Sequence, residues 1–259
     1  MGVDLKGKVC VVTGAARSIG LAVAEKYCQH GASVALIDIL PEVKDQADRL
    51  KKEGFDVAGY VLDITDQNAV LACFETIAKN LGNVFALANI AGAVDQQSIE
   101  EMTPERIDRM MQINFNGSVY CVQGALKTMK NYKDGRIINF ASKSGKTGSA
   151  LMGAYSGAKG AIISLTHALA FELAGDQIKV NCLCPGIVDA TGVWSSVSKG
   201  YVENMKMERD EIVDKFTAKI PLQRLAAIDD IVAWCEFLTI HGDYNTGQAF
   251  NVSGGREVH

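Results

Sequence analysis

Residues 9–20 read VCVVTGAARSIG, and this stretch decides the fold class. The run Val9–Thr13 is short, apolar and mostly β-branched, which predicts a buried strand. The small residues from Gly14 onward predict a tight turn that opens directly into a helix, because glycine accepts backbone conformations that other residues avoid. A strand, a tight turn and a helix form the first half of a βαβ unit.

The same succession continues over the 259 residues of the chain. After Val9–Thr13, strands are predicted at Ser33–Asp38, Val57–Leu62, Val84–Asn89, Arg136–Ala141, Lys179–Leu183 and Ala249–Val252. Helix-length segments lie at about 20–29, 41–53, 67–81, 104–130, 152–174 and 228–240. This alternation predicts right-handed crossovers and a parallel sheet that is buried on both faces. We therefore expect one α/β domain over 1–259, a Rossmann-type doubly wound sheet of about seven strands with helices on both faces.

The segment at about 189–219 departs from this pattern. It is polar, rich in Ser, Lys and Glu, and has no strand signal. We predict a helical excursion that acts as a lid over a substrate, with Trp194 near its start.

Composition excludes several classes of partner. The formal net charge is −4 and no basic run is longer than Lys51-Lys52, so a nucleic acid is not expected to bind. The apolar runs are much shorter than the roughly 20 residues of a membrane helix, and Asp4 and Lys6 disfavour a signal peptide. We expect a soluble cytoplasmic protein with no membrane partner.

The cysteines and histidines give no sign of a metal site. The seven cysteines contain no C-x-x-C motif and mostly lie in apolar runs, which predicts buried reduced thiols. The four histidines are widely separated. We expect chemistry without a protein-bound metal.

The turn after the first strand is a candidate cofactor site. Free backbone N–H groups at a helix start, with the positive end of the helix dipole, bind a pyrophosphate, although Gly14 and Gly20 alone suit any tight βα turn as well. Asp38 ends the second strand, 24 positions after Gly14, where a carboxylate accepts hydrogen bonds from an adenosine ribose and repels a 2′-phosphate. Arg17 argues for the 2′-phosphate. We give Asp38 more weight, because it faces the ribose directly, and predict NAD rather than NADP.

Two further strand ends belong to the same edge of the sheet. Asp63 closes the third strand and Asn89-Ile90-Ala91-Gly92 closes the fourth. Asp63 could simply cap the next helix, and Asn89 could simply satisfy backbone groups. Their joint position at carboxyl ends, where open α/β sheets bind ligands, favours a role with the cofactor.

The sequence Tyr155-Ser156-Gly157-Ala158-Lys159 supplies candidate catalytic groups. Its four-residue spacing places Tyr155 and Lys159 on one helical face. We expect the ammonium of Lys159 to lower the pKa of Tyr155 from its ordinary value near 10, so that the phenol can transfer protons. Ser142, at the preceding strand end, could donate to the same substrate oxygen.

With these motifs in this order, the chain resembles the short-chain dehydrogenase/reductase family from Leu5 to Gly255. The residues that carry the resemblance are TGAARSIG at 13–20, Asp38, Asp63, NIAG at 89–92, Asn114, Ser142, YSGAK at 155–159, PG at 185–186 and TGQ at 246–248. Two positions depart from the family pattern. Ser18 replaces the usual middle glycine, and Ala190-Thr191 shifts a threonine that often contacts the nicotinamide carboxamide.

The resemblance implies a site in which Asn114, Ser142, Tyr155 and Lys159 carry proton transfer, with Asn114 holding a water that links Lys159 to solvent. Lys159 also binds the nicotinamide ribose, and the segment 185–188 contacts the nicotinamide. It also implies a homotetramer that associates through the helices at about 104–130 and 152–174, whose apolar residues could instead serve the core. The cofactor contacts would be Gly14, Arg17, Ser18, Ile19, Gly20, Asp38, Ile39, Asp63, Ile64, Asn89, Ala91, Gly92, Tyr155, Lys159, Pro185, Gly186 and Val188.

The substrate is less sharply defined. Residues 142–148, 185–188 and 220–224 look most like sugar-alcohol dehydrogenases, including sorbitol-6-phosphate 2-dehydrogenase, and like acetoin (butanediol) reductases. Lys143 and Lys146 are either solvated loop residues or inward cations that favour a small polyol, its phosphate, or a vicinal diol or hydroxyketone. The expected substrate contacts are Ser142, Lys143, Ser144, Tyr155, Gly186 and Trp194.

Other functions share the same residues. A 3-oxoacyl carrier-protein reductase or a hydroxysteroid dehydrogenase would use the same catalytic groups, and a non-catalytic nucleotide-sensing protein could use the same fold.

Overall fold

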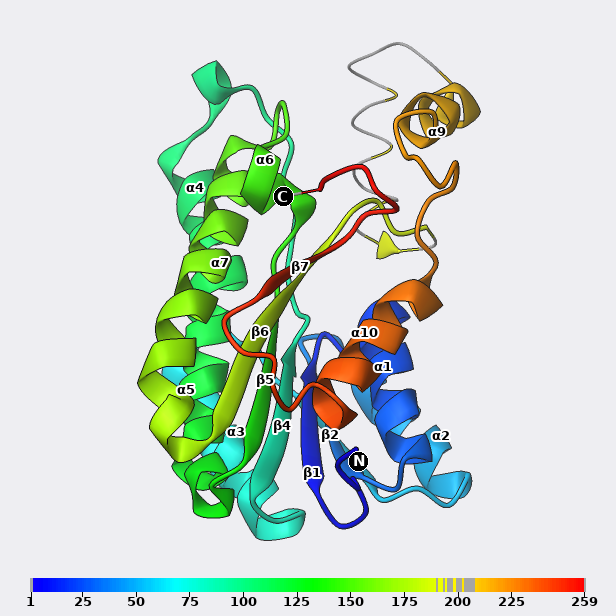
Figure 1. The fold of residues 1–259 in the computed structure, drawn as a ribbon. Coiled ribbons are helices and arrows are strands. Elements are labelled where there is room, and N and C mark those ends of the chain that lie inside the picture. Colours follow the sequence, from blue (N-terminus) through cyan, green and yellow to red (C-terminus); the bar gives the residue numbers. More distant parts are fainter. Residues whose placement is uncertain are drawn as a thin grey trace.

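A computed structural model describes residues 2–189, 191, 192, 194, 198, 202 and 208–258. Its centre is one sheet of seven strands in the order β3-β2-β1-β4-β5-β6-β7, and every neighbouring pair is parallel (Figure 1). The strands are β1 Val9–Thr13, β2 Ser33–Asp38, β3 Val57–Val61, β4 Val84–Asn89, β5 Gly135–Phe140, β6 Ile178–Pro185 and β7 Ala249–Val252. The predicted doubly wound sheet is confirmed.

Helices cover both faces of this sheet (Figure 1). One face carries α1 Ser18–Gln29, α2 Glu42–Lys52 and α10 Ile228–Ile240, and the other carries α3 Gln67–Asn80, α5 Gly117–Met129 and α7 Gly153–Leu173. Strand residues alternate between two apolar cores because successive side chains point to opposite faces. Cys10 and Val12 belong to the core under α1, whereas Val9 and Val11 belong to the core under α3.

Two helical regions differ from the sequence prediction. The expected helix at 104–130 consists of α4 Pro104–Met111, a π-helical turn Gln112–Asn116 and α5. The short helix α6 Lys143–Thr147 follows β5 directly and was not predicted. Short 3-10 turns lie at Ile99–Glu101, Lys130–Tyr132 and Ala174–Asp176.

The predicted lid at 189–219 is described only in part. Its last portion contains the helix α9 Arg209–Thr217. Most of the segment before Glu208, including Ala190, lies outside the described residues.

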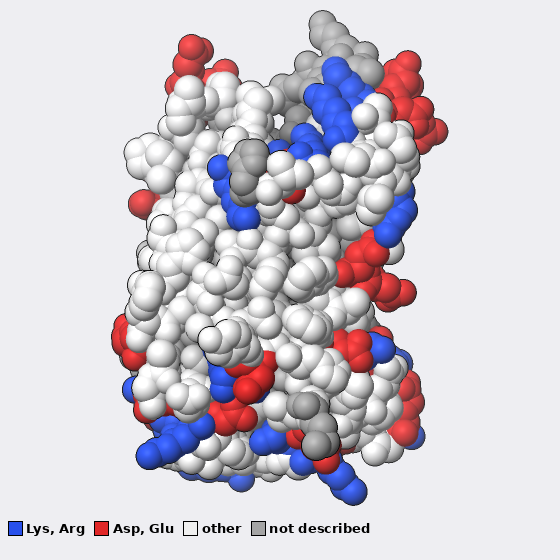
Figure 2. All heavy atoms as spheres, in the orientation of Figure 1, with Lys and Arg blue, Asp and Glu red and all other residues white. Residues whose placement is uncertain are grey.

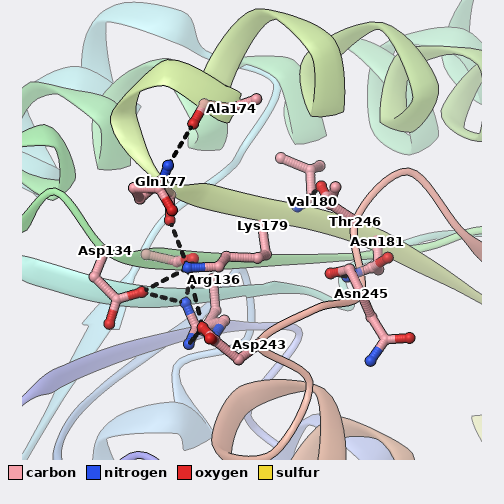
Figure 3. A network of polar contacts seen from close by, with 11 residues as sticks. Asp134, Arg136, Ala174, Gln177, Lys179, Val180, Asn181, Asp243, Asn245 and Thr246 are labelled. Atoms are coloured by element: carbon pink, nitrogen blue, oxygen red, sulfur yellow. Dashed lines mark hydrogen bonds and ion pairs between the residues drawn. The ribbon is translucent and has the colours of Figure 1, made fainter.

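The amino ends of β5 and β6 are joined by a polar network (Figure 3). Arg136 is 1% exposed and donates hydrogen bonds to Asp134 at 2.5 Å and to Asp243 at 3.1 Å. Lys179 binds the same two carboxylates at 3.1 Å each. The network binds the loop after α10 to the amino end of the sheet. This end lies opposite the carboxyl end of β5, which leads into α6 and α7.

The described part of the chain contains no helix that is long and apolar enough to cross a membrane. All seven cysteines are free, and six of them are buried. In that same part, no group of three or more His, Cys, Asp or Glu side chains is placed to hold a metal ion.

Candidate active site

A cleft of about 1170 Å³ opens along the carboxyl ends of the strands. The strand order reverses between β1 and β4, and this switch point is where open α/β sheets bind ligands. The cleft is larger than the roughly 300–1,000 Å³ of ordinary small-molecule sites, so a dinucleotide and a second small molecule can share it. Every predicted site residue lines the cleft except Asn89.

Asn89 lies inside the protein instead. It is 2% exposed, and its amide donates to the Ser118 carbonyl at 3.2 Å and to Oδ1 of Asn139 at 3.0 Å. These bonds join β4 to α5 and β5. The Asn89 side chain therefore holds together the elements beneath the cleft and is not among the groups that line it.

The turn into α1 has the geometry of an anion site. A Cβ on Gly20 would lie 2.1 Å from the Gly14 carbonyl oxygen, so only glycine allows this close approach of helix and turn. Ser18 has φ +56°, a left-handed conformation that favours glycine and explains the family preference at this position. The Oγ atom of Ser18 is buried without a hydrogen-bond partner among the described residues. An unpaired donor beside free helix N–H groups suits a phosphate oxygen.

Asp38 is held rigidly at the end of β2. Its two carboxylate oxygens accept the N–H groups of Ala16 at 2.9 Å and Leu40 at 3.0 Å. Each oxygen keeps a further lone pair for a ligand hydroxyl. Arg17 and Asp63 line the same end of the cleft, and Asp63 accepts two hydrogen bonds from Thr65.

Asn114 is fixed in the π-helical turn, a feature that often marks functional sites. Its side chain is fully buried, and Nδ2 donates to the carbonyls of Ala93 at 2.8 Å and Met110 at 3.1 Å. Oδ1 accepts the Ala93 N–H at 3.2 Å. The amide therefore has a single orientation beside the cleft.

Ser142 and Tyr155 are brought together by α6 and α7. Ser142 caps α6, and its Oγ accepts the Ser144 N–H at 3.1 Å. Its side chain is also hydrogen-bonded to Tyr155. The two helices touch through their main chains, because a Cβ on Gly145 would lie 2.6 Å from the carbonyl carbon of Lys159. The spacing of the two hydroxyls thus depends on this backbone contact.

Lys159 lies beneath Tyr155 and is 4% exposed. Its Nζ donates to the Phe140 carbonyl at 2.7 Å and lies 5.8 Å from the centre of the Tyr155 ring. Burial lowers the pKa of Lys159 to about 8. Burial also raises the pKa of Tyr155, and the Ser142 hydrogen bond opposes this rise. The expectation that Lys159 lowers the pKa of Tyr155 is wrong for this arrangement, because desolvation of the phenolate raises that pKa and the opposing effect comes from Ser142 rather than from Lys159.

Comparison with known proteins places this geometry in a family. The model of the short chain dehydrogenase family matches residues 8–201. The chain belongs to the short-chain dehydrogenase family. It is 35% identical over 254 residues to a sorbitol dehydrogenase of Cereibacter sphaeroides, covering 97% of this chain and 98% of that protein. It is 32% identical over 253 residues to a galactitol 2-dehydrogenase of Agrobacterium fabrum, covering 97% and 98%.

A solved structure of similar shape is the crystal structure of an NAD⁺-bound xylitol dehydrogenase. The TM-score is 0.92 at 28% identity, with 98% of this chain and all of that chain covered. The fold, the family and the resemblance to sugar-alcohol dehydrogenases are therefore confirmed, and this short-chain dehydrogenase is an oxidoreductase.

The other end of the cleft in this short-chain dehydrogenase contains the predicted substrate residues. Trp194 is 3% exposed and packs edge-to-face on Phe216 at 6.1 Å. Lys143 lines the cleft, whereas Lys146 donates to the Ala249 carbonyl at 2.7 Å and does not line it. Sequence reasoning missed further lining residues because no local pattern marks them: Arg109, Lys215, Phe216, Lys219 and Arg256.

Proposed function

We propose that this chain is an NAD-dependent dehydrogenase that interconverts a secondary alcohol and a ketone on a small polyol, polyol phosphate, or vicinal diol or hydroxyketone. The observation that carries the proposal is the meeting of Ser142, Tyr155 and Lys159 in the cleft that also contains Asp38. The names of the relatives, which act on sorbitol, galactitol and xylitol, support the substrate class.

The residues of the cleft fit the dinucleotide. The unpaired Ser18 hydroxyl and the first turn of α1 would hold the pyrophosphate, and Asp38 would hold the adenosine ribose. Lys159 and Pro185-Gly186 would contact the nicotinamide half. When bound, NAD supplies the hydride acceptor and donor for the reaction.

The chain's own groups would handle the proton. Ser142 would donate a hydrogen bond to the substrate oxygen, which stabilises charge that develops there. Tyr155, which burial keeps protonated near neutral pH, would pass its phenolic proton onward as it accepts the alcohol proton during oxidation, and would donate its proton to the ketone oxygen during reduction. Lys159, with a pKa of about 8, is the next proton-accepting group. Asn114 Oδ1 and Lys159 Nζ both border Gly92, so Asn114 is placed to guide the proton onward.

Assembly and location are part of the same proposal. Phe171 on α7 is 88% exposed and Ile107 on α4 is 41% exposed, which supports association of these helices in a homotetramer. Seven free thiols support a reducing, cytoplasmic location. Trp194 would pack on the substrate as part of a lid. A monomer mass in solution scattering would refute the tetramer.

The test is a screen of NAD reduction over polyols, polyol phosphates, vicinal diols, hydroxysteroids and 3-hydroxyacyl thioesters, repeated with NADP. We expect turnover with NAD on at least one of the first three classes. A steroid or a thioester as the best substrate would refute the substrate class, and absence of any substrate-dependent NADH signal would refute the dehydrogenase function.

A further inference from the structure

The substrate end of the cleft is lined by cations from three separate parts of the chain. Lys143 opens α6, Lys219 follows α9, and Arg256 belongs to the tail after β7. Figure 2 shows Lys and Arg side chains gathered beside α9 at the top of the molecule, where the surface is hollowed. Among the described residues, the only acids that line the cleft are Asp38 and Asp63, and both lie at the cofactor end.

Arg256 and Lys219 are both close enough to Lys143 to act on its charge. Lys143 is half-buried, and within the described part of the chain its Nζ donates one long hydrogen bond, 3.5 Å to the Gly148 carbonyl. Its pKa is lowered, first by burial and next by the positive charge of Arg256, with Lys219 adding to the effect. Like charges that converge in a partly desolvated place repel each other, so an anion bound between them is stabilised.

One carboxylate stands beside the cluster. Glu257 lies next to Lys143, and its Oε1 is 3.3 Å from Nε of Arg256. The Glu257 side chain is 7% exposed and does not line the cleft. Lys215 and Arg109 line the cleft as well, so cations outnumber this carboxylate and the substrate end carries a net positive charge, which suits a doubly charged anion such as a phosphate monoester.

Packing holds the guanidinium in position. Arg256 lies 5.5 Å from the centre of the Phe216 ring, and its side chain is 17% exposed. A guanidinium fixed on an aromatic ring presents its planar fork to an oxyanion, and two ammonium groups add point charges. Lys143 directly follows Ser142, and both line the cleft with Lys219 and Arg256, so a substrate bound at Ser142 has the cations within the same cleft.

We propose that Lys143, Lys219 and Arg256 form a subsite for an oxyanion at the far end of the substrate, and that the preferred substrate is a polyol phosphate rather than a neutral polyol. This inference rests on the proposed function, which it narrows to one substrate class.

The experiment compares kcat/KM for matched pairs of a polyol and its monophosphate, such as sorbitol with sorbitol 6-phosphate, with the corresponding sugar acid as a carboxylate. In the wild type we expect the phosphate to be preferred by about tenfold or more, since one charge-assisted hydrogen bond is worth about that factor.

Lys219→Gln and Arg256→Gln should each reduce this preference about fivefold to fiftyfold, while kcat/KM for the neutral polyol changes little. Arg256→Lys should lose less, because it keeps the charge. Preference for the sugar acid instead would overturn the assignment to phosphate.

Lys51→Gln, on the exposed end of α2, is the matched control and should leave the preference unchanged. A second readout is inhibition of neutral polyol oxidation by inorganic phosphate, which should weaken in Arg256→Gln. Equal use of the neutral polyol, with no effect of either variant, overturns the subsite and leaves the dehydrogenase function intact. If no alcohol is oxidised, the proposed function fails. Calorimetry with inorganic phosphate then decides the subsite, and absence of binding to the wild type overturns it.

Discussion

Gly92→Ala is a sharp test of how the catalytic groups are held. A Cβ at this position would lie 2.8 Å from Oδ1 of Asn114 and 3.3 Å from Nζ of Lys159. Ordinary contacts of a Cβ begin near 3.4 Å, so Asn114 must move by about 0.6 Å. Its amide is fully buried and is bonded to both polar groups of Ala93 and to the Met110 carbonyl. The shift of the Asn114 side chain therefore breaks hydrogen bonds.

The size of the effect follows from those bonds. Each net hydrogen bond is worth about 1 kcal/mol, and a buried polar group left unpaired costs about 1–3 kcal/mol. We expect Gly92→Ala to lower the free energy of unfolding by about 1–3 kcal/mol, which corresponds to a fall in Tm of about 2–10 °C for a chain of this size. A shift of about 1 Å in a catalytic group costs about a hundredfold in rate, so kcat should fall about tenfold or more.

The assay combines thermal unfolding with steady-state kinetics on the best substrate. Gly175→Ala is the control, because a Cβ there meets nothing within 4 Å, and it should retain wild-type kcat and Tm. Wild-type kcat and Tm in Gly92→Ala would show that Asn114 yields freely, and the reasoning from its three hydrogen bonds would be wrong.

Four further outcomes are expected. Tyr155→Phe should lower kcat about 10²–10⁴-fold and leave NADH affinity unchanged. The control is Tyr244→Phe, because Tyr244 is fully exposed, and it should keep wild-type kcat. More than about a tenth of the activity left in Tyr155→Phe would contradict its proton-transfer role. Because Lys159 has a pKa of about 8 and alcohol oxidation releases a proton, kcat for oxidation should rise from about pH 7 to about pH 9. Over the same range, kcat for ketone reduction should fall. Flat pH profiles would refute proton transfer through Tyr155 and Lys159. Asp38→Asn loses the charge and keeps only one of the two side-chain acceptors that bind the Ala16 and Leu40 N–H groups, so NAD efficiency should drop about tenfold relative to NADP. A wild type that prefers NADP would refute the assignment. Arg136→Met should lower Tm by about 2–10 °C without changing KM, since it removes the buried guanidinium that binds Asp134 and Asp243 and leaves Lys179 as their shared cation. A changed KM would contradict the separation of this network from the cleft.

Local sequence predicts what depends on local order. The strands and most helices follow from apolar runs and turns, so all seven strands were predicted to within a few residues. Ser142, Tyr155 and Lys159 could be selected because their spacing and their positions after strands are visible in the chain. The π-helical turn at Asn114 was missed because its periodicity differs from that of an α-helix by one residue in one turn.

What the sequence could not predict depends on contacts between distant segments. Arg256 lies more than a hundred residues from Lys143, and only the folded tail brings it to the cleft. Asn89 looked like a ligand contact because of its position at a strand end, yet Asn139 on the neighbouring strand binds it. The pKa of Tyr155 depends on burial by surrounding elements, which the four-residue spacing to Lys159 does not reveal.

The backbone contact at Gly145 separates substitutions that change substrate choice from substitutions that change the proton-transfer groups. The reacting hydroxyls are spaced by main-chain atoms of α6 and α7, whereas Lys219 and Arg256 come from segments that do not set that spacing. Substitutions at Lys219 and Arg256 can therefore alter which molecule is accepted without retuning the proton-transfer groups. A library that randomises these two positions and retains glycine at 145 should yield many active variants with new substrate ranges.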